Sequence, residues 1–336
     1  MILLAGCGAA TSTTGVAAPP TAPASPVSPP PAGATAAPTV APVPSPGAEA
    51  PRLPVTVTDY QGQQVAITSI ERIVSLNGDI TEIIFALGMG DRIVGVDSSA
   101  TYPRERTKAL PNVGYQRRLN AEGILALTPT LVIGDETAGP PEALAQIRSA
   151  GVPVALTADP PDLAAPMAKI RFVAAALGIP ERGETLAAQV EREITTARAA
   201  ARELSAAPRV LFLYLRGTDV QQVGGSETPI DAMIKGAGGV NAAAEAGIVQ
   251  FKPLSPEVIV AAQPDVLLLL EKGLESVGGV EGLLRIPGLA DTPAARHQHI
   301  VAMDDLYLLG MGPRTGQALA DLTMAFRAAM LREAGR

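Results

Sequence analysis

Residues 113–133 read VGYQRRLNAEGILALTPTLVI, and part of this stretch recurs about 135 residues further along the chain. Residues 254–268, which read LSPEVIVAAQPDVLL, align without gaps on residues 119–133. The two copies share a Leu, a Glu, an Ile, an Ala and a Pro at matched positions. Such a repeat predicts two related lobes, each with one acidic residue at the same place. Only the first copy is preceded by Tyr115 and Arg117, so the lobes are expected to differ in what they hold.

The composition describes a chain with enough apolar material for two cores. Of its 336 residues, 47% are hydrophobic, which is sufficient for two domains of ordinary size. The formal charge is −7, and the 26 basic residues are scattered, so no basic patch attracts nucleic acid. Nucleic acid is therefore not expected as a partner. Aromatic residues make up only 3% of the chain, so each of the five tyrosines needs its own explanation.

The N-terminus begins with an apolar run that ends in Leu4-Ala5-Gly6-Cys7, which resembles the bacterial lipobox. In that signal the Cys becomes the lipidated first residue of the mature protein. Residues 1–7 are interpreted as a lipoprotein signal that has lost its front end, because a complete signal has a basic start and at least ~7 apolar residues. Cys7 is the only cysteine, so no intrachain disulfide forms, and its alternative interpretation is an incidental free thiol.

Residues 8–53 form a segment rich in Pro and Ala. Thirteen of the 31 prolines lie before Val55, and Glu49 is the only charged residue before Arg52. This composition cannot bury enough apolar surface to fold, and its prolines keep the chain extended. The segment is predicted to be a disordered tether that holds a folded domain off the outer face of a membrane. No later run reaches ~18 consecutive apolar residues, so no transmembrane helix is expected.

From Val55 onward, short β-rich runs alternate with helical ones. The predicted strands of the first lobe are residues 55–58, 64–67, 72–76, 93–96, 130–133 and 151–156, and its predicted helices are residues 79–88 and 121–127. The first two strands are typical of a hairpin, and Asn120 is the expected cap of the second helix. Strands that alternate with helices predict parallel sheets covered by helices. The first lobe is assigned to residues 54–160.

A helical connector and a second lobe follow. Residues 161–206 are dominated by Ala, Leu, Glu and Arg, with one break near residues 178–180, and at ~1.5 Å per residue a helix here is long enough to reach from one lobe to the next. The second lobe, residues 207–336, contains a strand at 209–214, the repeat, and a terminal helix from Thr315. The predicted fold class is α/β, with two βα lobes that have central parallel sheets and are joined by a single long helix.

Taken together, the lipobox, the tether, the two lobes and the connector resemble the helix-linked class, class III, of ABC-transporter substrate-binding proteins. That class includes corrinoid, ferric-siderophore and haem binders. Within it, Val-Gly-Tyr-x-Arg-x-Leu followed by Ala-Glu-Gly-Ile-Leu is similar to the haem-binding branch, as are residues 95–99, GVDSS, and residues 303–315, MDDLYLLGMGPRT. The resemblance covers the chain from about Arg72 to the C-terminus. It implies a non-enzymatic haem receptor on the outer face of the cytoplasmic membrane, which passes haem to an ABC permease dimer with its ATPase subunits.

The resemblance places Tyr115 on the haem iron. A phenolate is a hard oxygen donor that suits Fe(III), and tyrosine is among the proximal haem ligands. An isolated Tyr has a pKa near ~10, so a nearby cation is needed to favour the phenolate, and Arg117 is the candidate. The alternative interpretation of Tyr115 is a loop aromatic that packs over the lobe edge.

The second lobe supplies candidate partners for the haem propionates. Some haem binders have a His soon after the first strand of this lobe, whereas this chain has Arg216 near that position. A guanidinium binds a carboxylate through two parallel hydrogen bonds, so Arg216 is assigned to a propionate. Lys252 and Arg314 are further propionate candidates, with solvated surface cations as the alternative. Tyr214 is interpreted mainly as a structural residue of the strand.

The only histidines, His297 and His299, flank Gln298 before a predicted strand. A pair at strand period could chelate a metal on one face. No Cys and no carboxylate accompanies them convincingly, so they are interpreted as part of a surface turn, and no metal site is assigned.

Glu122 and Glu257 are the paired acids of the repeat. Each lies in the first turn of a short helix, where the helix dipole stabilises a carboxylate by a few tenths of a kcal/mol. The resemblance implies a second role, in which each acid docks into arginines of one permease subunit. Catalytic acid and base roles are disfavoured, because the repeat puts the two residues on equivalent outer surfaces.

Other classes of protein fit less well. Residues 88–95, GMGDRIVG, have the glycine scatter of a dinucleotide loop, but they follow a helix and precede a strand, which is the reverse of the order that a dinucleotide-dependent enzyme needs. No hydrolase triad or Gly-x-Ser-x-Gly motif is present. The closer alternative is a corrinoid or ferric-siderophore binding protein of the same fold. For haem itself, one or two molecules in the cleft are both consistent with the sequence.

Overall fold

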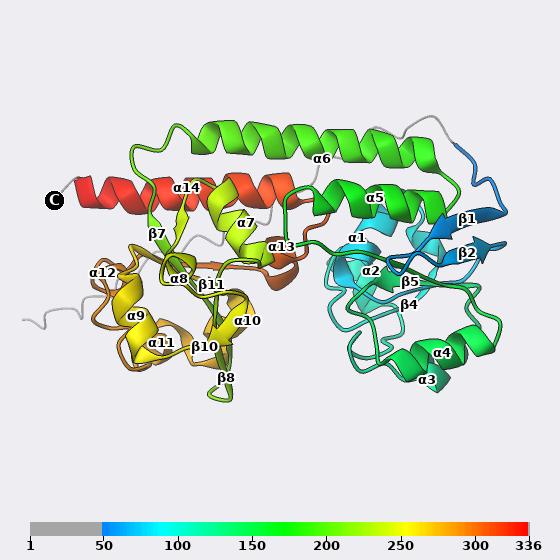
Figure 1. Cartoon of the computed structure of the whole chain (residues 1–336), viewed down its shortest axis with the longest axis horizontal. Helices are drawn as coiled ribbons and strands as arrows, with labels where there is room; N and C mark the ends of the chain where they lie inside the picture. The colour runs from blue at the N-terminus through cyan, green and yellow to red at the C-terminus, as the bar shows by residue number, and fades with distance from the viewer. Residues whose placement is uncertain (1–48, 335–336) are drawn as a thin grey trace, which may run out of the picture. The chain divides into compact units, whose positions relative to one another are not determined.

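The computed structural model describes residues 49–334 as two α/β lobes and a layer of long helices (Figure 1). Cys7, the predicted signal at residues 1–7 and most of the predicted tether lie outside the described residues. In the part of the chain that is described, none of the helices has the length and hydropathy that a bilayer-spanning helix requires.

The N-terminal lobe is built on a four-stranded sheet with the order β4-β3-β5-β6, in which every strand pair is parallel. The predicted antiparallel hairpin β1-β2 precedes it. The strands of the parallel sheet are short apolar runs that are almost entirely buried, as expected for a sheet covered by helices. The elements of this lobe are β1 (Val55–Thr58), β2 (Gln64–Ile67), β3 (Ile73–Ser75), α1 (Gly78–Ala86), the 3-10 helix η1 (Gly90–Arg92), β4 (Ile93–Val96), α2 (Arg104–Lys108), α3 (Ala121–Leu125), β5 (Leu131–Asp135), α4 (Pro141–Ser149) and β6 (Val154–Thr157).

The C-terminal lobe has a mixed sheet with the order β10-β8-β7-β11-β12, and β9 also pairs with β7. Its centre, β7-β11-β12, is parallel as predicted, whereas β8 and β10 are antiparallel additions at one edge. The elements are β7 (Arg209–Arg216), β8 (Val220–Gly224), α7 (Pro229–Gly236), β9 (Val240–Asn241), α8 (Ala242–Glu245), β10 (Phe251–Pro253), α9 (Pro256–Ala262), β11 (Val266–Leu270), α10 (Glu271–Ser276), α11 (Gly279–Leu284), α12 (Pro293–Arg296), β12 (Ile300–Met303), α13 (Asp305–Leu309) and α14 (Thr315–Ala334).

The sequence repeat is also a structural repeat. Asn120 and Ser255 cap α3 and α9 in the same way, since each side chain accepts a hydrogen bond from a backbone N–H of the first helical turn. At the other end of these helices, the matched residues Thr128 and Gln263 have positive φ angles of 45° and 38°. The strands β5 and β11 follow at the same offset. The prediction of two related lobes is therefore confirmed, and the two copies share the helix caps and the positive φ angle after the repeated helix.

One arginine in each lobe ties the repeated helix to the sheet. The guanidinium of Arg72 donates to the carbonyl oxygen of Leu127 at 2.7 Å, and that of Arg209 donates to the carbonyl oxygen of Ala262 at 2.9 Å. Leu127 and Ala262 occupy matched positions of the repeat. Ala262 is the last residue of α9 and Leu127 lies two residues after α3, and a cation is favourable near the C-terminal end of a helix because its carbonyl groups carry partial negative charge. The relation between the lobes thus extends beyond the aligned sequence.

The predicted connector at residues 161–206 is two helices. α5 (Ala165–Ala176) packs on β1, α1 and β6 and so belongs to the N-terminal lobe. The chain turns at Gly178, where φ is +71° and an added Cβ would lie 2.5 Å from the carbonyl oxygen of Arg52, so only glycine fits. α6 (Pro180–Ala201) then runs back along α5 and continues beside α14 to the second lobe (Figure 1). One long helix, α6, therefore links the lobes.

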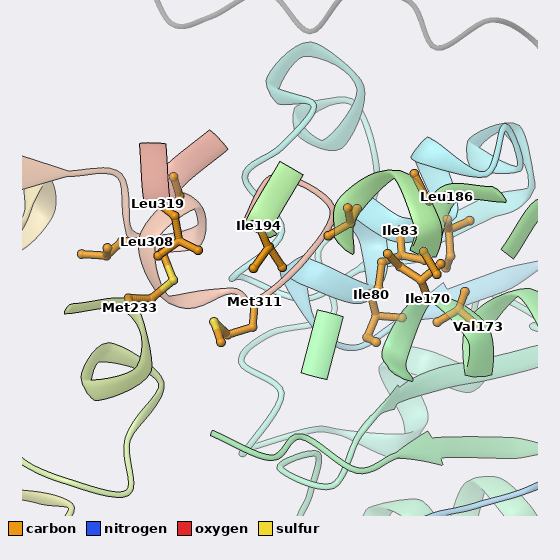
Figure 2. Packing of buried hydrophobic residues seen from close by; sticks show 14 of the residues in the cluster. Ile80, Ile83, Ile170, Val173, Leu186, Ile194, Met233, Leu308, Met311 and Leu319 are labelled. Carbon is orange, nitrogen blue, oxygen red and sulfur yellow. The ribbon is translucent and has the colours of Figure 1, made fainter. Parts of the chain in front are cut away.

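The largest apolar cluster includes residues of both lobes and of the helices between them. Its members include Ile80 of α1, Ile170 of α5, Ile194 of α6 and Leu319 of α14 (Figure 2). The buried apolar residues of α6 form one stripe: Leu186, Ala187, Val190, Ile194, Ala197 and Ala201. Full burial of each large side chain contributes about 1.5–3 kcal/mol. The two lobes are therefore held by shared packing as well as by the chain.

The folded part begins before the predicted boundary at residue 54. The guanidinium of Arg182 donates to the carbonyl oxygen of Glu49 at 2.6 Å, and its backbone N–H donates to Oε2 of Glu49 at 3.0 Å. The backbone N–H of Arg52 donates to the carbonyl oxygen of Gly178 at 2.9 Å. Residues 49–53 thus bind the corner between α5 and α6. The composition of residues 49–53 does not reveal this contact, because backbone groups and one carboxylate make the contact and apolar side chains do not.

Candidate functional site

Tyr115 lies in a loop at the carboxyl end of β4. The preceding residues run along the end of this strand, where the N–H of Val113 donates to the carbonyl oxygen of Val96 at 2.9 Å. Gly114 follows with a φ of +94°, which is unfavourable for a residue with a side chain. The Tyr115 residue is 46% exposed, so its ring is not a buried core group. Such a side chain is accessible to a ligand from outside the lobe.

Arg117 lies at the tip of a tight turn that begins at Tyr115. The N–H of Arg118 donates to the carbonyl oxygen of Tyr115 at 2.8 Å and closes this turn. Arg117 is exposed, and no acidic side chain among residues 49–334 forms an ion pair with it. Its charge is therefore available to an anionic ligand.

Arg216 is already paired in its own lobe. Its guanidinium donates to Oδ1 of Asp305 at 2.6 Å and to the carbonyl oxygen of Leu215 at 2.8 Å. It also lies 4.5 Å from the centre of the Tyr214 ring, as a cation–π contact. Oδ2 of Asp305 is buried without a hydrogen-bond partner among the described residues. A carboxylate ligand at Arg216 has to share this guanidinium with Asp305 or replace it.

Lys252 is an exposed residue of the edge strand β10, opposite Val223 of β8. No carboxylate of the described part of the chain forms an ion pair with it. Its neighbour Phe251 contacts the ring of Tyr214 edge-on, with 6.0 Å between the ring centres. Lys252 is therefore an available cation on the edge strand of this sheet.

Arg314 joins the two lobes. Its guanidinium forms two hydrogen bonds, of 2.8 and 2.9 Å, with the carboxylate of Glu82 on α1. The same group lies between the rings of Tyr102 and Tyr307, at 3.7 and 4.9 Å from their centres. Burial raises the pKa of Glu82, and the hydrogen bonds and charge of Arg314 oppose this shift. Arg314 is thus a partly buried residue that is paired with Glu82, and it is not the solvated surface cation that the sequence offered as its alternative interpretation.

A buried ionic cluster beneath this contact has no counterpart in the sequence analysis. The ammonium group of Lys169 on α5 donates to Oδ2 of Asp79 at 2.6 Å, Oδ1 of Asp159 at 2.9 Å and the carbonyl oxygen of Gly310 at 3.0 Å. Neighbouring charges and hydrogen bonds outweigh burial and raise the pKa of Lys169. Asp79, Asp135 and Asp159 have carboxylate oxygens within 4.8 Å of one another, and the ammonium group supplies the compensating charge. The sequence feature that could have indicated this cluster is Lys169, a charged residue among the buried apolar residues of α5.

Asp97 and Asp135 are buried at the carboxyl ends of the parallel strands β4 and β5. Burial raises the pKa of Asp97 to about 7 and that of Asp135 to about 6. Asp97 accepts hydrogen bonds from the N–H and the hydroxyl of Ser99, both at 2.9 Å, and Asp135 accepts one from Asn77 at 2.8 Å. Both acids hold the loops around the first turn of α1. They stabilise the scaffold beside the Tyr115 loop.

Glu122 and Glu257 occupy the same position in their helices, the second residue of α3 and of α9. Both are exposed. A hydrogen bond from the Ser255 side chain lowers the pKa of Glu257, so its carboxylate is charged at neutral pH. The structure therefore places the matched acid of each copy of the repeat at the surface of its lobe, as the repeat predicts.

The interpretation of the histidines as a surface turn is wrong for His299. His299 is only 3% exposed, and its Nδ1 lies 3.1 Å from the carbonyl oxygen of Asp265. Its own carbonyl oxygen accepts from the N–H of Leu267, which connects it to β11. The His297 and His299 rings pack against each other, with 5.5 Å between their centres. A turn residue that packs behind a sheet is not distinguished from an exposed one by local sequence.

Two repeated α/β lobes joined by one long helix define a binding protein of the helix-linked class. The sequence profile described as periplasmic binding protein matches residues 73–307. The chain belongs to the periplasmic binding protein family.

Solved structures with high similarity to this chain are haem-binding members. The periplasmic haem-binding protein RhuT from Roseiflexus sp. RS-1, in apo form, is 77% identical with a TM-score of 0.77, and the match covers 78% of this chain and 99% of that one. BhuT, solved in complex with two haems, is 40% identical with a TM-score of 0.72 over 77% of this chain and 98% of that one. HmuT is 36% identical with a TM-score of 0.78, over 84% of this chain and 93% of that one.

Curated relatives are more distant. An uncharacterised ABC transporter substrate-binding lipoprotein, YvrC of Bacillus subtilis (strain 168), is 27% identical over 80% of this chain and 84% of its own. A vitamin B12-binding protein of Vibrio parahaemolyticus is 25% identical over 80% of this chain and 93% of its own. These matches extend over most of each relative, so they concern the whole fold and not one motif.

Proposed function

We propose that this chain is an extracytoplasmic receptor that binds haem and delivers it to an ABC importer. The observation that carries the proposal is the 77% identity to the haem-binding protein RhuT over nearly all of that protein, together with an exposed tyrosine at the predicted ligand position. The protein has no enzymatic role in this scheme. It binds a cargo and passes it on.

Tyr115 is proposed as the iron ligand. Its ring is accessible, its backbone is held in a glycine turn, and its phenolate suits Fe(III). Arg117, two residues further along an exposed turn, is the cation that stabilises the phenolate. A charge that is not paired within the lobe serves this role better than one already bound to a carboxylate.

The propionates are proposed to bind cations of the second lobe. Lys252 is available without any rearrangement, whereas Arg216 has to share its guanidinium with Asp305. The spacing of Tyr214 and Arg216 equals that of a tyrosine and an arginine that are replaced by alanine in solved variants of HmuT. Arg314 is the least available candidate, because it must leave Glu82 and two tyrosine rings to reach a propionate.

Glu122 and Glu257 are proposed to dock onto arginines of the permease, one acid per subunit. The supporting observation is their matched, exposed position in the two halves of the structural repeat. A permease dimer with its ATPase subunits offers two related surfaces to two related lobes. Glu122→Ala and Glu257→Ala should each abolish most haem uptake by cells while haem affinity in solution stays unchanged. Weaker binding in solution would contradict a docking role.

The proposed location is the outer face of the cytoplasmic membrane, with Cys7 as the lipid-modified residue. Family membership supports an extracytoplasmic binding protein, and the Leu-Ala-Gly-Cys tetrapeptide supports the anchor. The substrate-binding lipoprotein of Bacillus subtilis is a relative in which such an anchor is named. Cys7→Ser should release the protein from membranes into the soluble fraction, and membrane retention of this variant would contradict lipidation.

An absorbance titration of the purified protein with hemin tests the central proposal. A saturable Soret change with the charge-transfer bands of a ferric tyrosinate should appear, and the equivalence point reports whether one or two haems bind. Tyr115→Ala should remove these bands and lower the affinity at least tenfold. Tyr60→Ala is the matched control, since Tyr60 is also exposed, at 39%, in the same lobe.

A corrinoid receptor is the second candidate. The similarity to a vitamin B12-binding protein supports it, at lower identity than the haem-binding structures. An absent Soret change together with saturable binding of cyanocobalamin would move the assignment to this candidate. Equal hemin binding by the Tyr115→Ala variant would keep haem as cargo and exclude the proposed ligand.

A further inference from the structure

The Tyr115 loop is held by hydrogen bonds on both sides of the tyrosine, and of its side chains only those of Val113 and Gln116 are partly buried. Tyr115, Arg117 and Arg118 are all exposed, and Gly114 contributes no side chain. An added Cβ on Gly114 would meet no atom within 4 Å, so the loop stands free on this side. Glycine is the most permissive residue of the backbone, so without other restraints the chain before Tyr115 would sample several conformations.

One side chain restrains the backbone on the N-terminal side of Tyr115. Oδ1 of Asn112 accepts the N–H of Gly114 at 2.8 Å and the hydroxyl of Ser98 at 3.2 Å. The N–H of Ser98 donates to the carbonyl oxygen of Gly114 at 2.8 Å. The N–H of Gly114 is therefore held by the side chain of Asn112, and its carbonyl oxygen is held by the backbone of Ser98, which follows β4.

The C-terminal side of the loop is fixed separately by the backbone. The N–H of Gly139 donates to the carbonyl oxygen of Gln116, and the N–H of Leu119 donates to the carbonyl oxygen of Gly139, both at 2.8 Å. These bonds need no particular side chain. Asn112 is thus the one residue whose side chain anchors the backbone of the Tyr115 loop directly, among the hydrogen bonds of the described residues.

We propose that Asn112 is a positioning residue, which holds Gly114 so that the Tyr115 ring has its haem-binding orientation before haem arrives. This inference rests on the proposed function, in which Tyr115 binds haem iron. A side chain that is already ordered loses less conformational entropy when haem binds than a side chain that haem has to order. Asn112 itself is exposed at the surface and contributes no core packing, so its replacement leaves the fold intact.

The test compares three variants of the full chain with hemin as the probe. Asn112→Ala removes the acceptor and should weaken hemin binding on the order of tenfold, with a shifted and broadened tyrosinate charge-transfer band. Asn112→Asp keeps an oxygen at the same place and should restore both the affinity and the band. Asn120→Ala is the matched control, because Asn120 is also exposed and also accepts a backbone N–H, that of Glu122, at 2.9 Å.

The outcomes separate this inference from the proposed function. Wild-type affinity and spectrum in Asn112→Ala overturn the positioning role, as does an equal loss in Asn120→Ala or a failure of Asn112→Asp to restore binding. Tyr115→Ala is titrated in parallel. If Tyr115→Ala loses the charge-transfer band while Asn112→Ala keeps it, only the inference fails. If Tyr115→Ala keeps the band, the proposed ligand is wrong and the inference fails with it.

Discussion

Replacement of Lys169 by Met tests how the buried ionic cluster stabilises the protein. The Lys169 side chain is 1% exposed, and those of its partners Asp79 and Asp159 are 8% and 24% exposed. Met has a similar length and keeps the apolar contacts of the side chain. The substitution therefore removes the charge and three hydrogen bonds, including the one to Gly310, with little change in packing.

The magnitude follows from the group that is left behind. Removing one partner of a buried ion pair costs about 3–5 kcal/mol, because the remaining charge has lost both water and its counter-ion. A domain of this size loses about 2 °C of melting temperature per kcal/mol, so Lys169→Met should melt about 6–10 °C lower at neutral pH. Without Lys169, Asp79 binds a proton more readily in the folded state than in the unfolded state. The loss of stability should therefore shrink as the pH falls toward 5.

Thermal unfolding followed by circular dichroism at pH 5 and pH 8 measures both effects. Arg171→Met is the control, since Arg171 lies two residues along the same helix and pairs with Glu184 at the surface, with side chains 46% and 62% exposed. A surface pair of this kind contributes about 0–1 kcal/mol. A melting temperature of Lys169→Met within about 2 °C of the wild type, or no lower than that of Arg171→Met, would refute the reasoning.

Three further predictions concern single residues. Burial raises the pKa of Asp97 to about 7. Between about pH 4 and pH 7 the folded state therefore keeps a proton on Asp97 that the unfolded state has lost, so the stability should fall as the pH rises through this window. Asp97→Asn should flatten this slope in melts from pH 4 to 8, and an unchanged slope would contradict it. Arg182→Ala should release residues 49–53, so trypsin should cleave after Arg52 faster than in the wild type. Mass spectrometry measures the cleavage rate, and equal rates in the two proteins would argue against the contact. Gly114→Ala should cost roughly 1–2 kcal/mol, since φ is +94°, and a melt equal to the wild type would show that the turn adapts.

The local features of this protein follow from its sequence alone. The caps Asn120 and Ser255 act within two or three residues of themselves, and the repeat records the same helix–strand unit twice. Alternation of β-rich and helical runs predicts the strands of the N-terminal lobe, and Gly178 marks the break between the connector helices. Glu122 and Glu257 could be identified as surface acids, because the first turn of a short helix follows directly from its cap.

Other features were decided only by the tertiary structure. Arg314 and Glu82 are 232 residues apart, and Lys169 and Asp79 are 90 apart, so no local pattern links them. A cation in the sequence is equally consistent with a free surface charge and with a buried pair, because the difference depends on which distant carboxylate the fold brings within about 3 Å. The sequence could thus nominate Tyr115 as the proposed iron ligand, by resemblance to a family. Which cations pair with distant carboxylates, and which stay unpaired, was determined by the packing of α1, α5 and the segment before α14.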